Sequence, residues 1–228
     1  GSDKESADEK PAHQVRISAF LIDAYEVTHE MFAKAELPNP SHWQEHPQMP
    51  VEQVRWRDSR RYCNERSLLE GLPPCYDESK PGWPCDFDAS GYRLPTEAEW
   101  EVAATTGPDG TRRPWFRWGD RDPLPSEAAL DGLTRGTVPV GAFSAGDGPW
   151  GHRQMIGNVW EWTSSTFEPY PLFEPDAYRD NSEPWFGTRK VLRGGSWSTR
   201  NRYVRSTYRN YFTPERRDVF AGFRTCAR

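Results

Sequence analysis

Hydrophobic positions in the first part of the chain fall into short patterned stretches. Residues 15–22, VRISAFLI, begin by alternating apolar and polar side chains, which predicts a strand. Residues 51–56, VEQVRW, are a similar stretch and predict a second strand. Residues 36–50 lie between them and contain four prolines, so we expect a loop there.

Helix-capping residues precede two further patterned stretches. Thr28 stands before a short helical pattern in which Phe32 is expected on the buried side, and Thr is a favoured helix N-cap. Asp58 is expected to cap a second helix, which carries Tyr62 and Cys63. The first third of the chain is therefore predicted to contain two helices.

The clearest local signal is the stretch LPTEAEWE at residues 94–101. Thr96 and Glu99 have the spacing of a capping box. In this motif the Thr96 hydroxyl accepts from the Glu99 amide, and the Glu99 carboxylate accepts from the Thr96 amide. Trp100 and the alanines that follow it at helical spacing are expected to face inward. The stretch therefore predicts a third helix.

The second half of the chain has a different pattern. Residues 108–228 alternate short apolar runs with Gly, Pro, Asp and Asn, which predicts short strands and long ordered loops. Only 35% of the 228 residues are hydrophobic, yet 11 are Trp, so aromatic rings must supply much of the core. We expect an extended arm at residues 1–14 and a single loop-rich domain over residues 15–228.

Charge and cysteine content narrow the class of protein. The net charge of −5 does not favour a nucleic-acid partner, and no apolar run approaches the roughly 20 residues that span a bilayer. A small-molecule or protein ligand is the expected partner, and the oligomeric state is not indicated. Cys75 and Cys85 flank a Gly/Pro-rich loop. A disulfide between them would indicate an extracytoplasmic compartment, whereas free thiols would fit the cytoplasm, which is slightly favoured.

Residues 154–163, QMIGNVWEWT, are the richest stretch for chemistry. Gly157 permits a backbone turn that other residues resist. Turned loop carbonyls together with the Glu161 carboxylate would make an oxygen cage suited to calcium. The alternative is a buried Glu161 that pairs with an arginine of the Arg-rich C-terminus, and spacing alone favours this alternative.

Two later stretches also carry candidate chemistry. Residues 191–197, VLRGGSW, run from an apolar strand into paired glycines, which suggests a bulge or a close backbone approach. Residues 209–224 alternate arginines with aromatic side chains. Such a segment could bind an anion or a carboxylate substrate through bidentate forks, or it could form structural Arg–carboxylate pairs.

Five stretches in order resemble the formylglycine-generating-enzyme (sulfatase-modifying factor) superfamily: FLIDAYEVTHEMF at 20–32, GYRLPTEAEWEVAA at 91–104, MIGNVWEWT at 155–163, VLRGGSW at 191–197 and AGFR at 221–224. The resemblance spans nearly the whole chain. It implies a variant of the C-type lectin fold, of the α+β class, with low regular secondary structure and many loops. It also implies one structural calcium, held by the matching positions Gln154, Gly157, Val159 and Glu161.

The resemblance does not extend to the oxidase chemistry for which the superfamily is named. Formylglycine-generating enzymes bind copper through two cysteines shortly after the RGGS motif, and Thr199 and Val204 stand at those positions here. Without thiolates there is no soft site for Cu(I). Formylglycine generation is therefore not expected.

The C-terminal third resembles the second, lectin-like domain of the ergothioneine-pathway sulfoxide synthases. In those enzymes a separate helical domain supplies three iron-ligating histidines, so Fe(II) is expected only if another domain or a partner provides the ligands. By position, Tyr178 matches a catalytic tyrosine, and Asn210 and Arg216 match residues that bind the carboxylates of a thiol substrate. Trp197 is expected to line the same cleft. Such a protein would be an oxygen-dependent oxidoreductase acting on thiols, or one part of it.

Two non-catalytic alternatives remain open on the sequence. Proteins of this fold include ligand-display proteins made variable by retroelements, and residues 198–203, STRNRY, are polar and aromatic as in a binding surface. A scaffold domain that has lost activity is the other alternative, because a fold does not fix a function.

Overall fold

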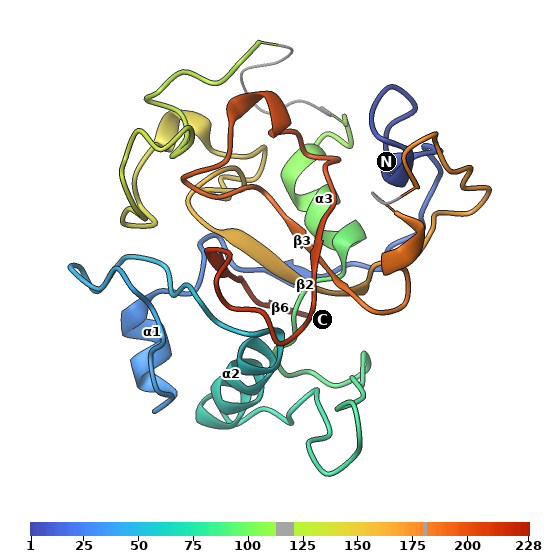
Figure 1. Ribbon diagram of the computed structural model, residues 1–228. Helices are drawn as coiled ribbons and strands as arrows, with labels where there is room; N and C mark the ends of the chain where they lie inside the picture. The colour runs from blue at the N-terminus through green and yellow to red at the C-terminus, as the bar shows by residue number, and fades with distance from the viewer. Residues whose placement is uncertain (113–120, 180–181) are drawn as a thin grey trace.

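A four-stranded sheet forms the centre of the fold (Figure 1). The computed structural model describes residues 1–112, 121–179 and 182–228. The strands lie in the order β4 (Asn210–Phe212), β3 (Lys190–Arg193), β2 (Trp160–Thr166) and β5 (Ala221–Gly222). The neighbours of β2 are antiparallel β3 and parallel β5, so β2 is a central strand.

A second, two-stranded sheet joins the two ends of the domain. It pairs β1 (Leu21–Ile22) with β6 (Cys226–Ala227) in antiparallel fashion. The short strands and the long segments between them confirm the prediction for the second half of the chain. The described residues also form 3-10 turns at Ala7–Glu9, Ser144–Gly146, Glu183–Trp185 and Asn201–Tyr203.

Three helices surround the central sheet: α1 (His29–Lys34), α2 (Trp56–Leu69) and α3 (Glu97–Thr105). In the view of Figure 1, α3 lies above β2 and α2 lies below it. Thr28 is the N-cap of α1, as predicted, and its side chain accepts from the Met31 amide at 3.2 Å.

The capping box at α3 is confirmed in both directions. The Thr96 hydroxyl accepts from the Glu99 amide at 3.1 Å, and the Glu99 carboxylate accepts from the Thr96 amide at 2.8 Å. Trp100 is fully buried, and the alanines after it are buried as well. Because α3 packs against β2 and β3, this local signal predicts a helix that lies against the central sheet.

Aromatic and aliphatic side chains share the main core, as the composition predicts. Phe32, Tyr62, Trp162 and Phe223 are buried together with smaller side chains from the loops. The Trp162 indole Nε1 also donates to the Val54 carbonyl at 2.9 Å, so the ring has a hydrogen-bond partner inside the core.

The two strands predicted in the first part of the chain are largely wrong. Of residues 15–22, only Leu21–Ile22 pair in a sheet. Residues 51–56 form no strand, because their amides bond to two different segments: Val51 to the Val27 carbonyl and Val54 to the Ala221 carbonyl. An apolar alternation predicts a buried face, but a strand also needs a continuous partner.

The cap of α2 also differs from the prediction. The helix begins at Trp56, so Asp58 lies inside its first turn and accepts from the Arg55 amide at 3.1 Å. Its predicted helical residues Tyr62 and Cys63 are both buried in α2. All four cysteines are free thiols, although Tyr76 and Cys85 form an isolated bridge beside Cys75. No helix of the described residues has the length and apolar character that crossing a membrane requires.

Candidate functional site

The loop before β2 is a tight turn that requires glycine. Gly157 has φ of +85°, and a Cβ there would lie 2.3 Å from the Ala129 carbonyl oxygen. The Gly157 amide donates to the Gly194 carbonyl at 3.0 Å, so the two glycine motifs meet. The predicted close backbone approach at Gly194 is thus confirmed.

Glu161 lies at the start of β2 and is buried. Its Oε1 accepts from Arg224 Nη2 at 2.7 Å. Its Oε2 accepts from Arg224 Nε at 2.7 Å and from Trp100 Nε1 at 2.8 Å. The alternative interpretation, a buried ion pair with a C-terminal arginine, is confirmed.

A second buried carboxyl group lies beside this pair. Glu26 accepts from Asn158 Nδ2 at 2.6 Å and from the Val159 amide at 3.4 Å. Burial and the nearby Glu161 charge raise the pKa of Glu26 well above its usual value, which favours the protonated form. Sequence reasoning missed Glu26, because it lies far from the loop in the chain.

Calcium at this loop stays a prediction. Gln154 Oε1 is buried without a hydrogen-bond partner, so this predicted ligand has an acceptor to offer. Both oxygens of Glu161 already accept hydrogen bonds, and the described residues contain no group of three or more His, Cys, Asp or Glu that could hold a metal. Gln154 therefore offers one free acceptor, whereas both oxygens of Glu161 are already bonded.

Chelation tests the calcium prediction. An ion that binds only the folded chain raises its melting temperature. If calcium is held here, EGTA lowers the melting temperature and added calcium restores it. An unchanged melting temperature would mean that Arg224 alone neutralises Glu161.

Trp197 belongs to a cluster of three aromatic rings. Its ring centroid lies 5.3 Å from that of Trp43 and 5.1 Å from that of Phe220. The Trp43 and Phe220 centroids are 5.5 Å apart, so each ring touches both others. The Trp197 indole Nε1 is buried and has no hydrogen-bond partner among the described residues. A donor in this state suits an acceptor on a ligand.

A buried carboxyl group supports the loop that carries Trp43. Glu52 Oε1 accepts from the His42 amide and, at 3.2 Å, from the Trp43 amide. Burial raises the pKa of Glu52, and its Oε2 is buried without a described partner. His42 and His46 are exposed in this loop, beyond the end of α1.

The other predicted site residues make no described contact with the aromatic cluster. Asn210 begins β4, and its Oδ1 accepts from the Tyr211 amide at 2.9 Å. Arg216 is exposed, bonds Asp218 at 2.7 Å and stacks on Phe212 at 4.5 Å. Tyr178 is 62% exposed in a loop. Among the described residues, no hydrogen bond or ring contact joins any two of Tyr178, Trp197, Asn210 and Arg216.

The positions that match the copper cysteines are polar and aliphatic. Thr199 Oγ1 accepts from the Ser196 amide at 2.9 Å, which closes the turn after the paired glycines. Val204 packs against the second core cluster with Trp100 and Met155. Neither side chain carries sulfur, so the absence of formylglycine generation stays an expectation from the sequence.

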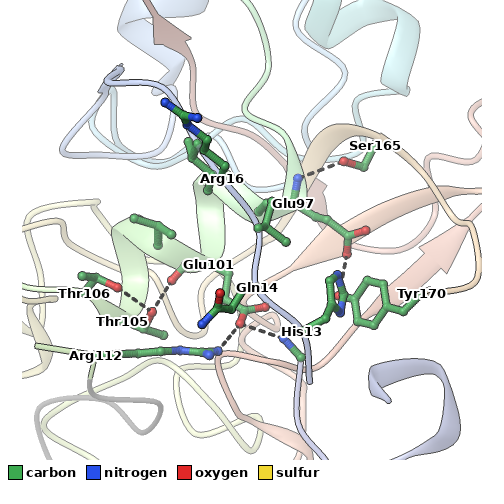
Figure 2. A pocket seen from close by; sticks show the side chains of 15 residues that line it. His13, Gln14, Arg16, Glu97, Glu101, Thr105, Thr106, Arg112, Ser165 and Tyr170 are labelled. Atoms are coloured by element: carbon green, nitrogen blue, oxygen red, sulfur yellow. Dashed lines mark hydrogen bonds and ion pairs between the residues drawn. The ribbon is translucent and has the colours of Figure 1, made fainter. Parts of the chain in front are cut away.

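A cavity of about 760 Å³ lies between the N-terminal arm and α3 (Figure 2). Its two glutamates are paired with arginines. Glu97 bonds Arg209 through both oxygens at 2.9 Å, and Glu101 pairs with Arg193 and Arg112. Figure 2 shows His13 of the arm beside Tyr170, whose ring centroids are 4.5 Å apart. None of the predicted site residues lines this cavity.

A family model decides the identity of the fold. The sulfatase-modifying factor enzyme 1-like domain matches residues 1–228. The chain belongs to this family. Its α+β, loop-rich fold of the formylglycine-generating-enzyme type is therefore confirmed, with Trp100, Glu161 and Arg224 joining three of its motifs.

Curated relatives include hercynine oxygenases. The Mycobacterium tuberculosis hercynine oxygenase is 34% identical over 233 residues, which cover 95% of this chain and 54% of the enzyme. That of Mycolicibacterium thermoresistibile is 45% identical over 140 residues, or 59% of this chain and 31% of the enzyme. The predicted similarity to sulfoxide synthases is confirmed, and the chain spans about half the length of the curated relatives that it matches.

Solved structures share the fold over the whole chain. Treponema denticola variable protein 1 superposes with a TM-score of 0.81 at 29% identity, covering 100% of this chain and 90% of that one. PvdO from Pseudomonas aeruginosa has a TM-score of 0.70 at 24% identity, covering 99% of this chain and 88% of that one. The fold thus occurs in chains of about this length as well as inside longer enzymes.

Proposed function

We propose that this chain is the substrate-binding part, or a relative, of a non-haem-iron sulfoxide synthase system. One observation carries the proposal: 95% of this chain aligns with hercynine oxygenase, but only 54% of that enzyme is covered. The iron-ligating histidines would then come from another domain or a partner, and this chain would hold the substrates. Hercynine and a thiol acid are the proposed ligands.

The surroundings of two predicted residues support this role. Trp197 offers a partly exposed aromatic face and a buried indole donor without a described partner. Arg216 is exposed on the loop after β4, where its guanidinium could turn from Asp218 to a ligand carboxylate. Exposed ion pairs of this kind are weak, at roughly 0–1 kcal/mol, so exchange of the partner costs little.

Titration calorimetry with variants tests which residues bind. We expect Trp197→Ala to weaken binding of hercynine, and Arg216→Gln to weaken binding of a cysteine-containing thiol acid, each by at least about tenfold. Arg61→Gln is the matched control, because Arg61 is also an exposed arginine with one weak carboxylate contact, at 3.8 Å to Glu65. The control should change binding by less than about twofold.

Two results would count against this assignment of residues. Equal losses in Arg216→Gln and Arg61→Gln would show that net charge alone governs binding. Unchanged affinity in both Trp197→Ala and Arg216→Gln would place the ligands elsewhere on the chain. Circular dichroism of each variant must match the parent chain, so that a loss of affinity is not a loss of folding.

A second candidate function is ligand display without catalysis. The whole-chain superposition on Treponema denticola variable protein 1 favours it, because that chain has nearly the same extent. Residues 198–203 fit this role, with Arg200, Arg202 and Tyr203 exposed. Thiol-dependent oxygen uptake separates the two candidates: a display protein shows none, even with Fe(II) and an added iron-binding domain.

A further inference from the structure

Three cationic side chains gather on two tryptophans at the amino-terminal end of α2. The Arg60 guanidinium carbon lies 3.7 Å from the Trp56 ring centroid, and Lys190 Nζ of β3 lies 4.1 Å from it. Arg60 also faces the Trp83 ring at 5.2 Å, and Arg57 does so at 4.7 Å. We call these five residues the Trp56 cluster.

The tryptophan platform of the cluster is fixed by the fold. Trp56 is the first residue of α2, and its indole Nε1 donates to the Thr163 carbonyl of β2 at 2.8 Å. Its amide donates to the Pro214 carbonyl at 3.1 Å. A ring held at both its backbone and its edge gives the cations a defined position.

No described carboxylate neutralises these cations. Arg60 donates through Nη1 to the Gly82 and Trp83 carbonyls at 2.8 and 3.1 Å. Lys190 donates to the Thr166 hydroxyl at 2.7 Å, and none of the three cations has an ion-pair partner in the described parts of the chain.

Other arginines of the same helix have acidic partners. Arg66 pairs with Asp23 at 2.6 Å and with Glu70 at 3.0 Å, and Arg61 pairs with Glu65 at 3.8 Å. Uncompensated positive charge is therefore a property of the cluster and not of α2 as a whole.

Burial makes this arrangement costly without an anion. Arg60 is 5% exposed, and its Nε is buried without a described acceptor. Burial is the main cause that lowers the pKa of Lys190 to about 8, and repulsion from the Arg60 charge is the second. The negative charge of Glu168 acts in the opposite direction and has a smaller effect. Arg57 also stands in the first turn of α2, where the helix dipole is positive and disfavours cations.

We propose that the Trp56 cluster is a binding site for an oxyanion, a carboxylate or phosphate group of a small ligand. An oxyanion would accept from the Lys190 ammonium, and the Arg60 guanidinium, which faces the same ring, would add to the attraction as a second positive charge. It would also complement the amino-terminal end of α2. The half-buried faces of Trp56 and Trp83 would contact the remainder of the ligand.

This site adjoins the one proposed for the sulfur-transfer substrates, because Lys190 pairs across the sheet with Phe212, but the two sites use different cations. Arg216 pairs with Asp218 and stacks on Phe212, and it makes no described contact with Arg57, Arg60 or Lys190. Absence of hercynine and thiol-acid binding would overturn the proposed function and leave the proposal for the Trp56 cluster standing. Failure of the cluster substitutions to affect anion binding would overturn the proposed anion site and leave the proposed function standing.

The probes are inorganic phosphate and malonate, added separately to the full chain at low ionic strength. The pKa of Lys190 is followed by the pH dependence of its amine labelling, read by peptide mass spectrometry. Without an anion we expect a value of about 8. A saturating anion should raise this value by about one unit or more, because a nearby opposite charge favours the ammonium. The probe with the larger effect identifies the preferred oxyanion.

Variants then locate the anion by calorimetry. Arg60→Gln and Lys190→Met should each weaken binding of the preferred anion by at least about tenfold, whereas Arg61→Gln, on the same helix, should change it by less than about twofold. Lys190→Met keeps an unbranched chain against Trp56 and removes a partly buried charge, so it should fold. It carries the test if Arg60→Gln does not fold.

Three outcomes would overturn the proposal. One is the absence of binding by both phosphate and malonate, with the pKa of Lys190 unchanged. Another is an affinity that Lys190→Met leaves intact. The third is an equal loss in Arg61→Gln, which would reduce the effect to the overall charge of the chain.

Discussion

Replacing Arg224 by methionine is expected to destabilise the domain by about 3–5 kcal/mol. Arg224 and Glu161 are both buried, and two hydrogen bonds of 2.7 Å join them. Removing the arginine leaves the Glu161 carboxylate in the core with Trp100 Nε1 as its remaining side-chain partner. Urea unfolding followed by far-ultraviolet circular dichroism measures the loss.

Two further variants show whether the unpaired charge is the cause. Glu161→Gln combined with Arg224→Met should recover part of the loss, because no buried charge is then left alone. Arg216→Gln removes an exposed arginine whose partner is Asp218, and it should cost less than about 1 kcal/mol. A loss below about 1 kcal/mol in Arg224→Met itself would contradict the account of this core.

Truncation of Trp162 to alanine is expected to cost a similar amount, about 3–5 kcal/mol. The ring is fully buried in the main core, and its Nε1 donates to the Val54 carbonyl at 2.9 Å. The substitution leaves a cavity at the centre of β2 and leaves the Val54 carbonyl without this donor. Chemical denaturation again provides the measurement.

Matched changes separate the two parts of this effect. Trp162→Phe keeps most of the buried ring and loses the hydrogen bond, so about 1–3 kcal/mol is expected. Leu172→Ala truncates a side chain that is 88% exposed and should change stability by less than about 0.5 kcal/mol. A large loss of stability in Leu172→Ala, or a small one in Trp162→Ala, would contradict a core that contains Trp162 and excludes Leu172.

Local chemistry made part of this fold predictable from sequence. Thr96 and Glu99 satisfy each other's backbone groups within a few residues, so their capping box predicts α3 without knowledge of the rest. Gly157 likewise reports a local turn. The ordered family motifs supplied the overall architecture, which neither composition nor periodicity could specify.

Contacts between distant segments could not be predicted in the same way. Trp43 and Phe220 complete the ring cluster around Trp197, but nothing local to either residue indicates the other. Residues 15–22 show the opposite failure: their alternation predicts a strand, yet none of these residues is buried and most of the stretch has no strand to pair with. The unpaired cations of the Trp56 cluster are also visible only in three dimensions, because Lys190 approaches α2 from β3.

The most direct test of the proposed function is titration of hercynine and a cysteine-containing thiol acid into the unmodified chain. The account predicts saturable binding of each ligand at a one-to-one ratio, in the absence of iron and without any partner domain. Saturating hercynine should leave the thiol-acid isotherm unchanged, since no described contact joins the aromatic cluster to Arg216. No binding of either ligand at millimolar concentration would contradict the account and favour the display function.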